Sequence, residues 1–143
     1  MDILVHNTCE ELVRYCSNAE VDAMKAVQGK LVPGKNGSRG AKWIADSNSD
    51  YAKSLAKSWG KKGRECKVTI KVKKGTTQWL KDNGVLFDVI GDEKSVAKNV
   101  IFKSTEPGAM GIGADLLEEF NSRITGMSYA TKNAKMRTME IAI

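Results

Sequence analysis

The chain has 143 residues, the length of one ordinary domain and enough to bury a core without disulfide or metal support. Its apolar share of 41% is normal for a globular protein, and no apolar run approaches the ~20 residues that cross a bilayer. The net charge of +6 suits either a solvated basic surface or an anionic partner, which we expect to be a nucleotide, a nucleic acid or an acidic protein. One histidine, and three cysteines without C-x-x-C spacing, argue against a zinc site and a disulfide framework, and so favour a reducing cytoplasm.

The chain opens with a segment, ILVHNTC at residues 3–9, that has the chemistry of a cleavage point. The side-chain amide of Asn7 can attack its own backbone carbonyl and break the Asn7–Thr8 bond, while His6 protonates the departing amine. This segment resembles the end of the self-cleaving processing modules that precede the toxin tip in large bacterial polymorphic toxins. The resemblance implies that residues 1–9 are the end of such a module or a linker and that residues 10–143 are a toxin catalytic domain.

The first elements that we expect are an apolar strand at residues 12–15 and a helix that follows it. Ser17 and Glu20 have the spacing of a capping box, which begins that helix, and Gly29 ends it. Residues 31–40 are rich in Pro, Gly, Asn and Ser and are typical of a loop.

A short strand is expected at residues 42–46, and a second helix follows it. Either Ser47 or Asn48 caps this helix, and Gly60 closes it. Its apolar face consists of Tyr51, Ala52, Leu55 and Trp59. Apolar and polar residues then alternate over residues 66–72, which indicates a half-buried strand containing the core cysteine Cys66. The other two cysteines, Cys9 and Cys16, are interpreted as incidental.

The rest of the chain mixes short strand and helix signals. In chain order they are a helical turn at residues 76–81, strands at 85–90 and 96–103, a glycine-rich loop at 107–113, a helix at 114–121, and a closing hairpin formed by 123–131 and 136–143. Strands and helices are interspersed without regular β-α-β spacing, so we expect an α+β fold.

Arg14, Ser47 and Glu106 occur in an order that resembles the Arg-Ser-Glu class of ADP-ribosyltransferase toxins. Such enzymes carry an arginine on the first strand, a serine-bearing strand preceded by an aromatic residue, and a late catalytic glutamate. The similarity covers residues 12–121 and includes a Gly-x-Leu-x-Pro-Gly loop at residues 29–34. It implies a compact split β-sheet core with short flanking helices. It also implies that the domain uses NAD as a substrate and needs no metal.

The resemblance assigns a role to each matching residue. Arg14, Tyr15, Trp43 and Ser47 would bind NAD, and Glu106 would be the catalytic carboxylate. A guanidinium is a fixed, two-pronged donor for phosphates, and a glutamate can stabilise the positive centre formed as nicotinamide leaves. Each residue also has a purely structural alternative. Arg14 would be an exposed strand residue, and the two aromatic residues would belong to the core. Ser47 would be a helix cap, and Glu106 a loop carboxylate.

The chain departs from the family pattern at two places. The Ser-Thr-Ser pattern falls on residues 45–47, where only Ser47 is a serine. Members that modify arginine have Glu or Gln two residues before the catalytic glutamate, whereas this chain has Ser104 there. Glu119 and Glu140 remain the alternative catalytic carboxylates.

A toxin of this kind implies a cognate immunity protein as partner, delivery within a larger secreted toxin, and action in the cytoplasm of a target cell. The acceptor of ADP-ribose would be a macromolecule, a protein rather than an RNA, and no membrane is involved. The main rival interpretation is a metal-independent ribonuclease toxin that cleaves tRNA or other RNA with Lys, Arg, Thr and Glu side chains, which the net charge also suits. A third is a binding domain or inhibitor without catalysis.

Overall fold

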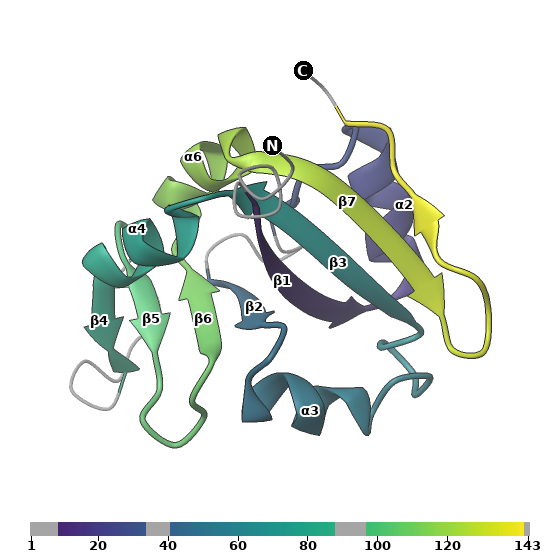
Figure 1. The fold of residues 1–143 in the computed structure, drawn as a ribbon, viewed down its shortest axis with the longest axis horizontal. Coiled ribbons are helices and arrows are strands. Elements are labelled where there is room, and N and C mark those ends of the chain that lie inside the picture. Colours follow the sequence, from purple (N-terminus) through teal and green to yellow (C-terminus); the bar gives the residue numbers. More distant parts are fainter. Residues whose placement is uncertain (1–8, 34–40, 88–96, 142–143) are drawn as a thin grey trace, which may run out of the picture.

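Eight strands form one mixed sheet in the order β4-β5-β6-β2-β1-β3-β7-β8 (Figure 1). The computed structural model describes residues 9–33, 41–87 and 97–141. The strands are β1 (Cys9–Cys16), β2 (Lys42–Asp46), β3 (Cys66–Lys73), β4 (Gly84–Leu86), β5 (Val100–Phe102), β6 (Ala109–Ile112), β7 (Ile124–Thr131) and β8 (Arg137–Thr138). Neighbouring strands are antiparallel except β4 and β5, which are parallel.

Four short helices and one 3-10 turn join these strands in the described part of the chain. They are α2 (Asn18–Ala26), α3 (Asp50–Ala56), α4 (Thr76–Asp82), the 3-10 turn η3 (Ala114–Leu116) and α6 (Leu117–Ser122). The predicted α+β class is therefore confirmed. Within the described residues, no helix combines the length and the apolar character that crossing a membrane requires.

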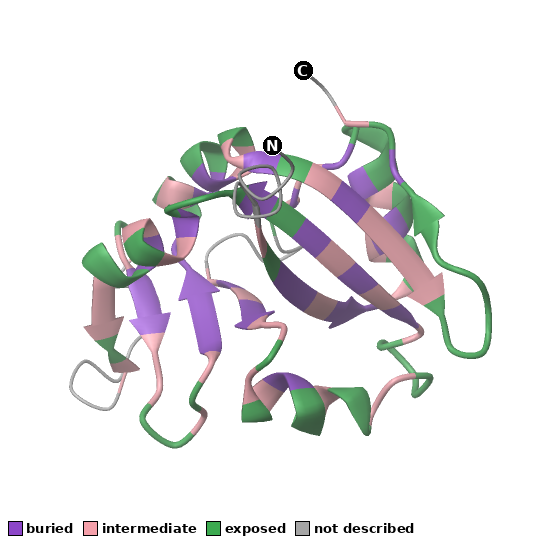
Figure 2. Cartoon of the chain, viewed as in Figure 1, coloured by how far each residue is buried: buried purple, intermediate pink, exposed green. Residues whose placement is uncertain are grey.

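The sheet buries both of its faces, but not equally. Alternate residues of β1 and β3 pack with Met24 of α2, Leu80 of α4 and Phe120 of α6 in the larger core. The opposite face has a smaller core, in which Val13 and Tyr15 of β1 meet α3. Figure 2 shows the resulting alternation of buried and partly exposed positions along β3 and β7.

Strands β1 and β2 join two halves of the sheet through a short contact. β1 pairs with β3 over its whole length, whereas its pairing with β2 consists of Leu12 with Asp46 and Val13 with Ala45. Beyond these pairs the two strands separate, because β2 continues with β6 while β1 stays with β3. We call this point of separation the fork (Figure 1).

Both helix starts that the sequence indicated exist, and one of the two predicted caps is confirmed. The Ser17 hydroxyl accepts a hydrogen bond from the Glu20 backbone N–H and caps α2. Ser49, rather than Ser47 or Asn48, caps α3, because the chain turns at residues 46–49 before the helix begins and the Ser49 hydroxyl accepts from the Ala52 N–H. Past α2, both Gln28 and Gly29 adopt positive φ angles, so the predicted end is confirmed.

The predicted glycine-rich loop at residues 107–113 is wrong, because most of it is the buried strand β6. Its glycines provide close packing. A Cβ on Gly111 would lie 2.9 Å from the Cζ2 atom of Trp43, and one on Gly113 would overlap the carbonyl oxygens of Ala97 and Asn99. The backbone N–H groups of this strand pair with β2 and β5, so they do not form a phosphate cradle.

Other predicted bounds change in detail. The strands at 42–46 and 66–72 and the helical turn at 76–81 are confirmed as β2, β3 and α4. β4, β5 and β8 are shorter than expected. Predictions that fall on residues 1–8, 34–40, 88–96 and 142–143 lie outside the described residues, including the cleavage segment with His6 and Asn7.

The interpretation of Cys16 as incidental is wrong. Cys16 is directly opposite Cys66 in the β1–β3 pair, and both thiols are free and buried in the larger core. Burial, followed by the negative charge of Glu20, raises the pKa of Cys16 to about 12, so its thiol stays protonated in the core.

Gly113→Ala should lower the free energy of unfolding by about 2 kcal/mol, because the new methyl group meets backbone that cannot rotate away. Gly126→Ala is the matched control, since its Cβ would meet the Lys71 Cβ at an ordinary 3.6 Å, and its stability should stay the same or rise by about 0.5 kcal/mol. Urea unfolding of both variants measures this, and equal stabilities would contradict the packing account of β6.

Candidate functional site

The fork is held by the side chain of Arg14, which comes from β1 and bonds to two other elements. Its Nε and Nη2 atoms both donate to the carboxylate of Glu20 in the first turn of α2, the second over 2.9 Å. Its Nη1 atom donates to the backbone carbonyl oxygen of Trp43 in β2 over 2.6 Å. One guanidinium therefore ties β1, α2 and β2 together where the two strands separate.

This side chain is charged although it is mostly enclosed. The exposed fractions of the Arg14 and Glu20 side chains are 18% and 19%. Burial disfavours both charges, but the hydrogen bonds and opposite charge between them outweigh it, so the pKa of Glu20 is lowered and that of Arg14 is raised. The pair is therefore ionised at neutral pH.

Lys42 adds a second positive charge at the same place. Its side chain is 6% exposed, and its Nζ lies 3.4 Å from Oε1 of Glu20. Burial, followed by the neighbouring charge of Arg14, lowers the pKa of Lys42. Two cations thus share one carboxylate, which gives the fork a surplus of positive charge in a poorly solvated setting.

Two hollows lie at the fork. The larger, about 470 Å³, adjoins α2, and its lining includes Glu20, Pro33 and Lys42. The smaller, about 60 Å³, lies on the α3 side, and its lining includes Arg14, Tyr51 and Arg64. Most of the open volume therefore adjoins the surplus charge, on the α2 side.

Glu106 lies on the turn between β5 and β6, on the same side as α3. Its side chain is 38% exposed and pairs with Lys103, whose Nζ lies 3.8 Å from Oε1. Burial raises the pKa of the Tyr51 hydroxyl, and the charge of Glu106 raises it further, while Arg64 and Arg14 oppose this. Tyr51 thus lies within electrostatic reach of both Arg14 and Glu106.

Trp43 takes part in the site through its backbone more directly than through its ring. Its carbonyl accepts from Arg14, while its ring lies over Gly111 and under the ammonium of Lys103, 4.6 Å from the ring centre. The same ammonium lies 5.1 Å from the centre of the Phe87 ring. The Trp43 ring is therefore already engaged by a cation of the chain itself.

The other residues predicted to bind NAD are less closely involved. Tyr15 is buried in the smaller core, where its ring makes an edge contact with Trp59 at 6.0 Å, although it also lines the α3-side hollow. Ser47 lies in the turn after β2, half-buried. The structure thus brings Arg14 to the Trp43 carbonyl and, through Lys103, Glu106 to the neighbourhood of the Trp43 ring. Tyr15 belongs to the smaller core, and Ser47 lies in the turn that follows β2.

The alternative carboxylates lie elsewhere. Glu119 is on α6, 54% exposed, and pairs with Arg123 one turn along at 3.4 Å. Glu140 is exposed and follows β8 at the far edge of the sheet. Of the three candidates, Glu106 is the one that acts on Tyr51, a residue that lines a hollow together with Arg14.

Sequence reasoning missed three members of this site. The sequence identifies Glu20 as part of a capping box, but in the structure its carboxylate binds Arg14. It predicts Lys42 only as a strand residue and Tyr51 only as part of a helix face. A signal did exist for Lys42, since a lysine inside a strand of otherwise buried residues needs a partner for its charge.

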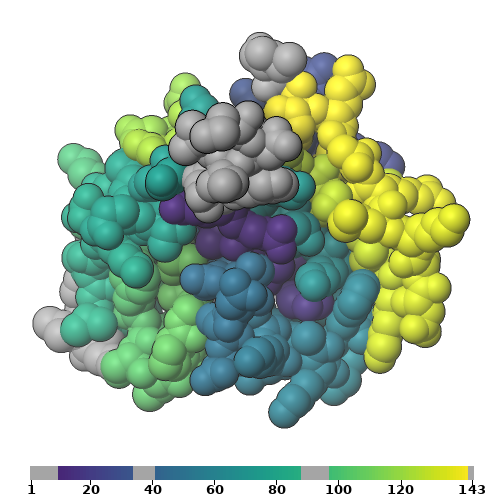
Figure 3. Space-filling view, viewed as in Figure 1, coloured from purple at the N-terminus to yellow at the C-terminus, as the bar shows by residue number. Residues whose placement is uncertain are grey.

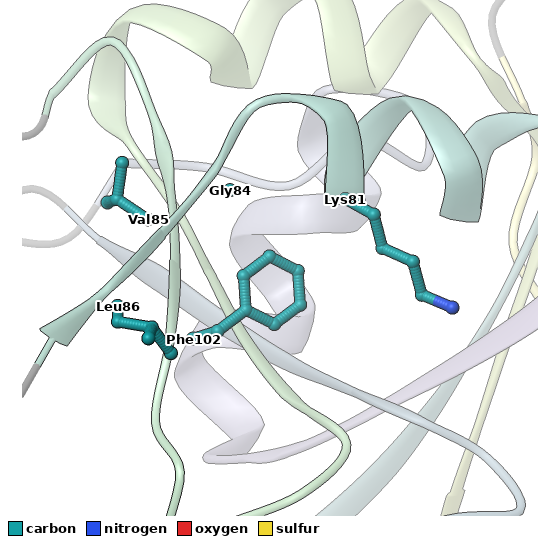
Figure 4. A pocket seen from close by; sticks show the side chains of 5 residues that line it. All are labelled: Lys81, Gly84, Val85, Leu86 and Phe102. Atoms are coloured by element: carbon teal, nitrogen blue, oxygen red, sulfur yellow. The ribbon is translucent and has the colours of Figure 1, made fainter.

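A further hollow, of about 330 Å³, opens at the β4 edge (Figure 4). Its lining consists of Lys81, Gly84, Val85, Leu86 and Phe102. The Phe102 ring packs against Gly84, and the lysine amine points away from the ring in Figure 4. None of the described residues that line this hollow carries a carboxylate or a hydroxyl, so they offer little for acid-base chemistry, and the fork remains the candidate site.

The protein-family models that were compared with this chain give no match, and neither do the curated proteins.

Glu20→Gln should lower the free energy of unfolding at neutral pH by about 2 kcal/mol, because Arg14 and Lys42 lose their shared carboxylate. The matched control Glu119→Gln removes an exposed pair and should change it by less than about 0.5 kcal/mol. Because the pKa of Glu20 is lowered on folding, its contribution is full above the ordinary value of 4.5 and is lost as pH falls below it.

Urea unfolding of the protein and both variants at a series of pH values measures this contribution. The gap between the unsubstituted protein and Glu20→Gln should narrow below pH 4.5. A gap that does not vary with pH, or one no larger than that of Glu119→Gln, would show that the ion pair does not hold the fork.

Proposed function

We propose that this chain is the catalytic domain of an antibacterial toxin that transfers ADP-ribose from NAD to a macromolecule of the target cell. The observation that carries the proposal is the fork itself. A partly buried arginine lies where two halves of the sheet separate, and a glutamate lies on the turn that leads into the neighbouring strand β6. Arg14 and Glu106 are 92 residues apart in the chain, yet the charges of both contribute to the pKa of Tyr51, which lines a hollow together with Arg14.

The sheet supports the finer fold assignment as well. A split sheet, in which β1 and β2 part to leave a cleft, is what the resemblance to Arg-Ser-Glu transferases implies. Here β1 and β2 share only two residue pairs before they separate. Glu106, the candidate carboxylate, lies just before β6. Strand β6 pairs with β2, and β2 is the next strand in the chain after β1, which carries Arg14.

The surplus charge at the fork suits the diphosphate of NAD. Two donors of the Arg14 guanidinium point to Glu20 and one points to Trp43, so Arg14 acts here as a clamp rather than as a free two-pronged phosphate ligand. Lys42 supplies the compact charge beside the larger hollow. We therefore assign the diphosphate to the α2 side of the fork, next to Lys42, and the nicotinamide end to the side of Tyr51 and Glu106.

Bond breaking would occur at the carbon that joins the ribose to nicotinamide. Nicotinamide leaves with the electron pair of that bond, and the ribose ring takes on positive character. A Glu106 carboxylate that accepts a hydrogen bond from a ribose hydroxyl stabilises this charge, as carboxylates do at other sugar centres. A nucleophile of the acceptor then bonds to the same carbon and releases a proton.

The proposal extends to the biological setting. A secreted polymorphic toxin would carry the domain into a competing cell, where it would act in the cytoplasm on a protein rather than an RNA. Its producer would need a cognate immunity protein. The reaction consumes NAD as a substrate and needs no metal ion.

Incubating the purified domain with labelled NAD and a bacterial lysate tests the reaction. We expect label on a macromolecular band and release of nicotinamide, and we expect Glu106→Gln to lower both by about a hundredfold or more. Glu119→Gln is the matched control, a carboxylate removed from an exposed position away from the fork, and should label at the original rate.

The possible outcomes test the enzyme class and the assignment of the catalytic residue separately. Labelling that survives Glu106→Gln would reject Glu106 while keeping the transferase class. No label and no nicotinamide, together with cleavage of total RNA, would reject the class in favour of a ribonuclease.

A further inference from the structure

A second group of cations surrounds Tyr129, two strands away from the fork. Tyr129 lies on β7, opposite Val68 of β3, which is itself opposite Arg14. On its other side it pairs with Arg137 of β8. Figure 3 shows the C-terminal hairpin, in yellow, forming one edge of the molecule.

The hydroxyl of Tyr129 accepts a hydrogen bond from one cation, Lys25, and its strand neighbour Arg137 brings a second positive charge beside it. Nζ of Lys25, on α2, donates to it over 3.1 Å and lies 5.1 Å from the centre of the ring. The Lys25 hydrogen bond lowers the pKa of Tyr129, and Arg137 lowers it further. A phenol oxygen that accepts such a bond still carries its own proton, which is then directed at a further acceptor.

Tyr129 also lines a polar recess of about 220 Å³ at the end of the β7–β8 hairpin. Its lining comprises Tyr129, Ala130, Thr131, Ala134, Lys135 and Arg137. Among the described residues, that lining holds two cations and two hydroxyl groups and no carboxylate. Lys25 adds a third cation through its bond to the Tyr129 hydroxyl, so every charge that these residues bring has the same sign.

We propose that this recess binds the phosphate group of a nucleotide or of a nucleic-acid strand, with Lys25, Tyr129 and Arg137 as its ligands. A compact anion with several oxygens can accept from a guanidinium, an ammonium and a hydroxyl at once. The recess is concave, which suits a phosphate better than a flat acidic surface. This inference does not rest on the NAD site, because it uses none of the residues of the fork, and it gives the positive net charge of +6 a specific place to act.

Two probes distinguish the two sources of phosphate. Inorganic phosphate is titrated into protein with ¹³C-labelled tyrosine, and we expect the Tyr129 ring signal to shift while that of Tyr15 stays in place. A mixed-sequence single-stranded RNA, followed by fluorescence anisotropy at several salt concentrations, tests the polymer. If a nucleic-acid strand is the natural ligand, RNA should bind with a dissociation constant at least about a hundredfold below that of inorganic phosphate, because one RNA strand makes several phosphate contacts.

Variants then assign the contacts. Tyr129→Phe keeps the ring and should weaken binding about threefold, and the double change of Lys25 and Arg137 to Met should weaken it at least tenfold, or roughly the loss of two charge-assisted bonds. Each removed cation should also lower the salt dependence of RNA binding by about one unit of slope. Lys98→Met is the control, an exposed lysine on the other half of the sheet, and should change the affinity less than twofold.

Three results would overturn the proposal. One is a Tyr129 signal that phosphate leaves unmoved. Another is a loss of RNA binding in Lys98→Met equal to that in the double variant, which would show diffuse attraction to a basic surface. The third is polyglutamate binding more tightly than RNA with the same dependence on Lys25 and Arg137, which would make an acidic protein the partner.

Discussion

The hydrogen bonds of one guanidinium determine how the two halves of this sheet meet. Where β1 leaves β2, the strands no longer satisfy each other's backbone groups, and the Trp43 carbonyl would be left without a backbone partner from β1. Arg14 fills that position and at the same time binds the first turn of α2 through Glu20. An arginine that is largely enclosed is tolerated only when its charge is paired and its donors are used, and both conditions are met here. The geometry of the fork, and with it any cleft for a ligand, therefore depends on this residue.

The same bonds change how Arg14 should be understood. The residue pattern points to a phosphate ligand, because a guanidinium is suited to that task. In the folded chain, its two-pronged edge is taken by a carboxylate of the chain itself. The charge that remains available belongs mainly to Lys42, which shares Glu20 with Arg14 and borders the larger hollow. Arg14 thus holds the strands together, while Lys42 supplies positive charge to the larger hollow.

Local signals predicted much of the fold. The cap at Ser17, the alternation along β3 and the apolar face of α3 each depend on neighbours within a few residues, so they can be recognised in the sequence. The β6 strand could not, because its glycines look like a loop until the Trp43 ring and the backbone of residues 97–99 are known to pack against them. The same limit applies to the site. Arg14, Trp43 and Glu106 could be named from their order in the chain, but the bond from Arg14 to Glu20 and the position of Tyr51 depend on how distant strands pair.

Direct observation of the Arg14 side chain during NAD binding tests the central claim most sharply. In ¹⁵N-labelled protein, the Nε–H group of a paired, enclosed arginine gives a distinct signal, and Glu20→Gln identifies the one that belongs to Arg14. If the fork is the NAD site, adding NAD shifts this signal, and the affinity falls in Lys42→Met. If NAD at millimolar concentration leaves the Arg14 signal unchanged, then the fork is a structural joint and the chemistry of this domain lies elsewhere.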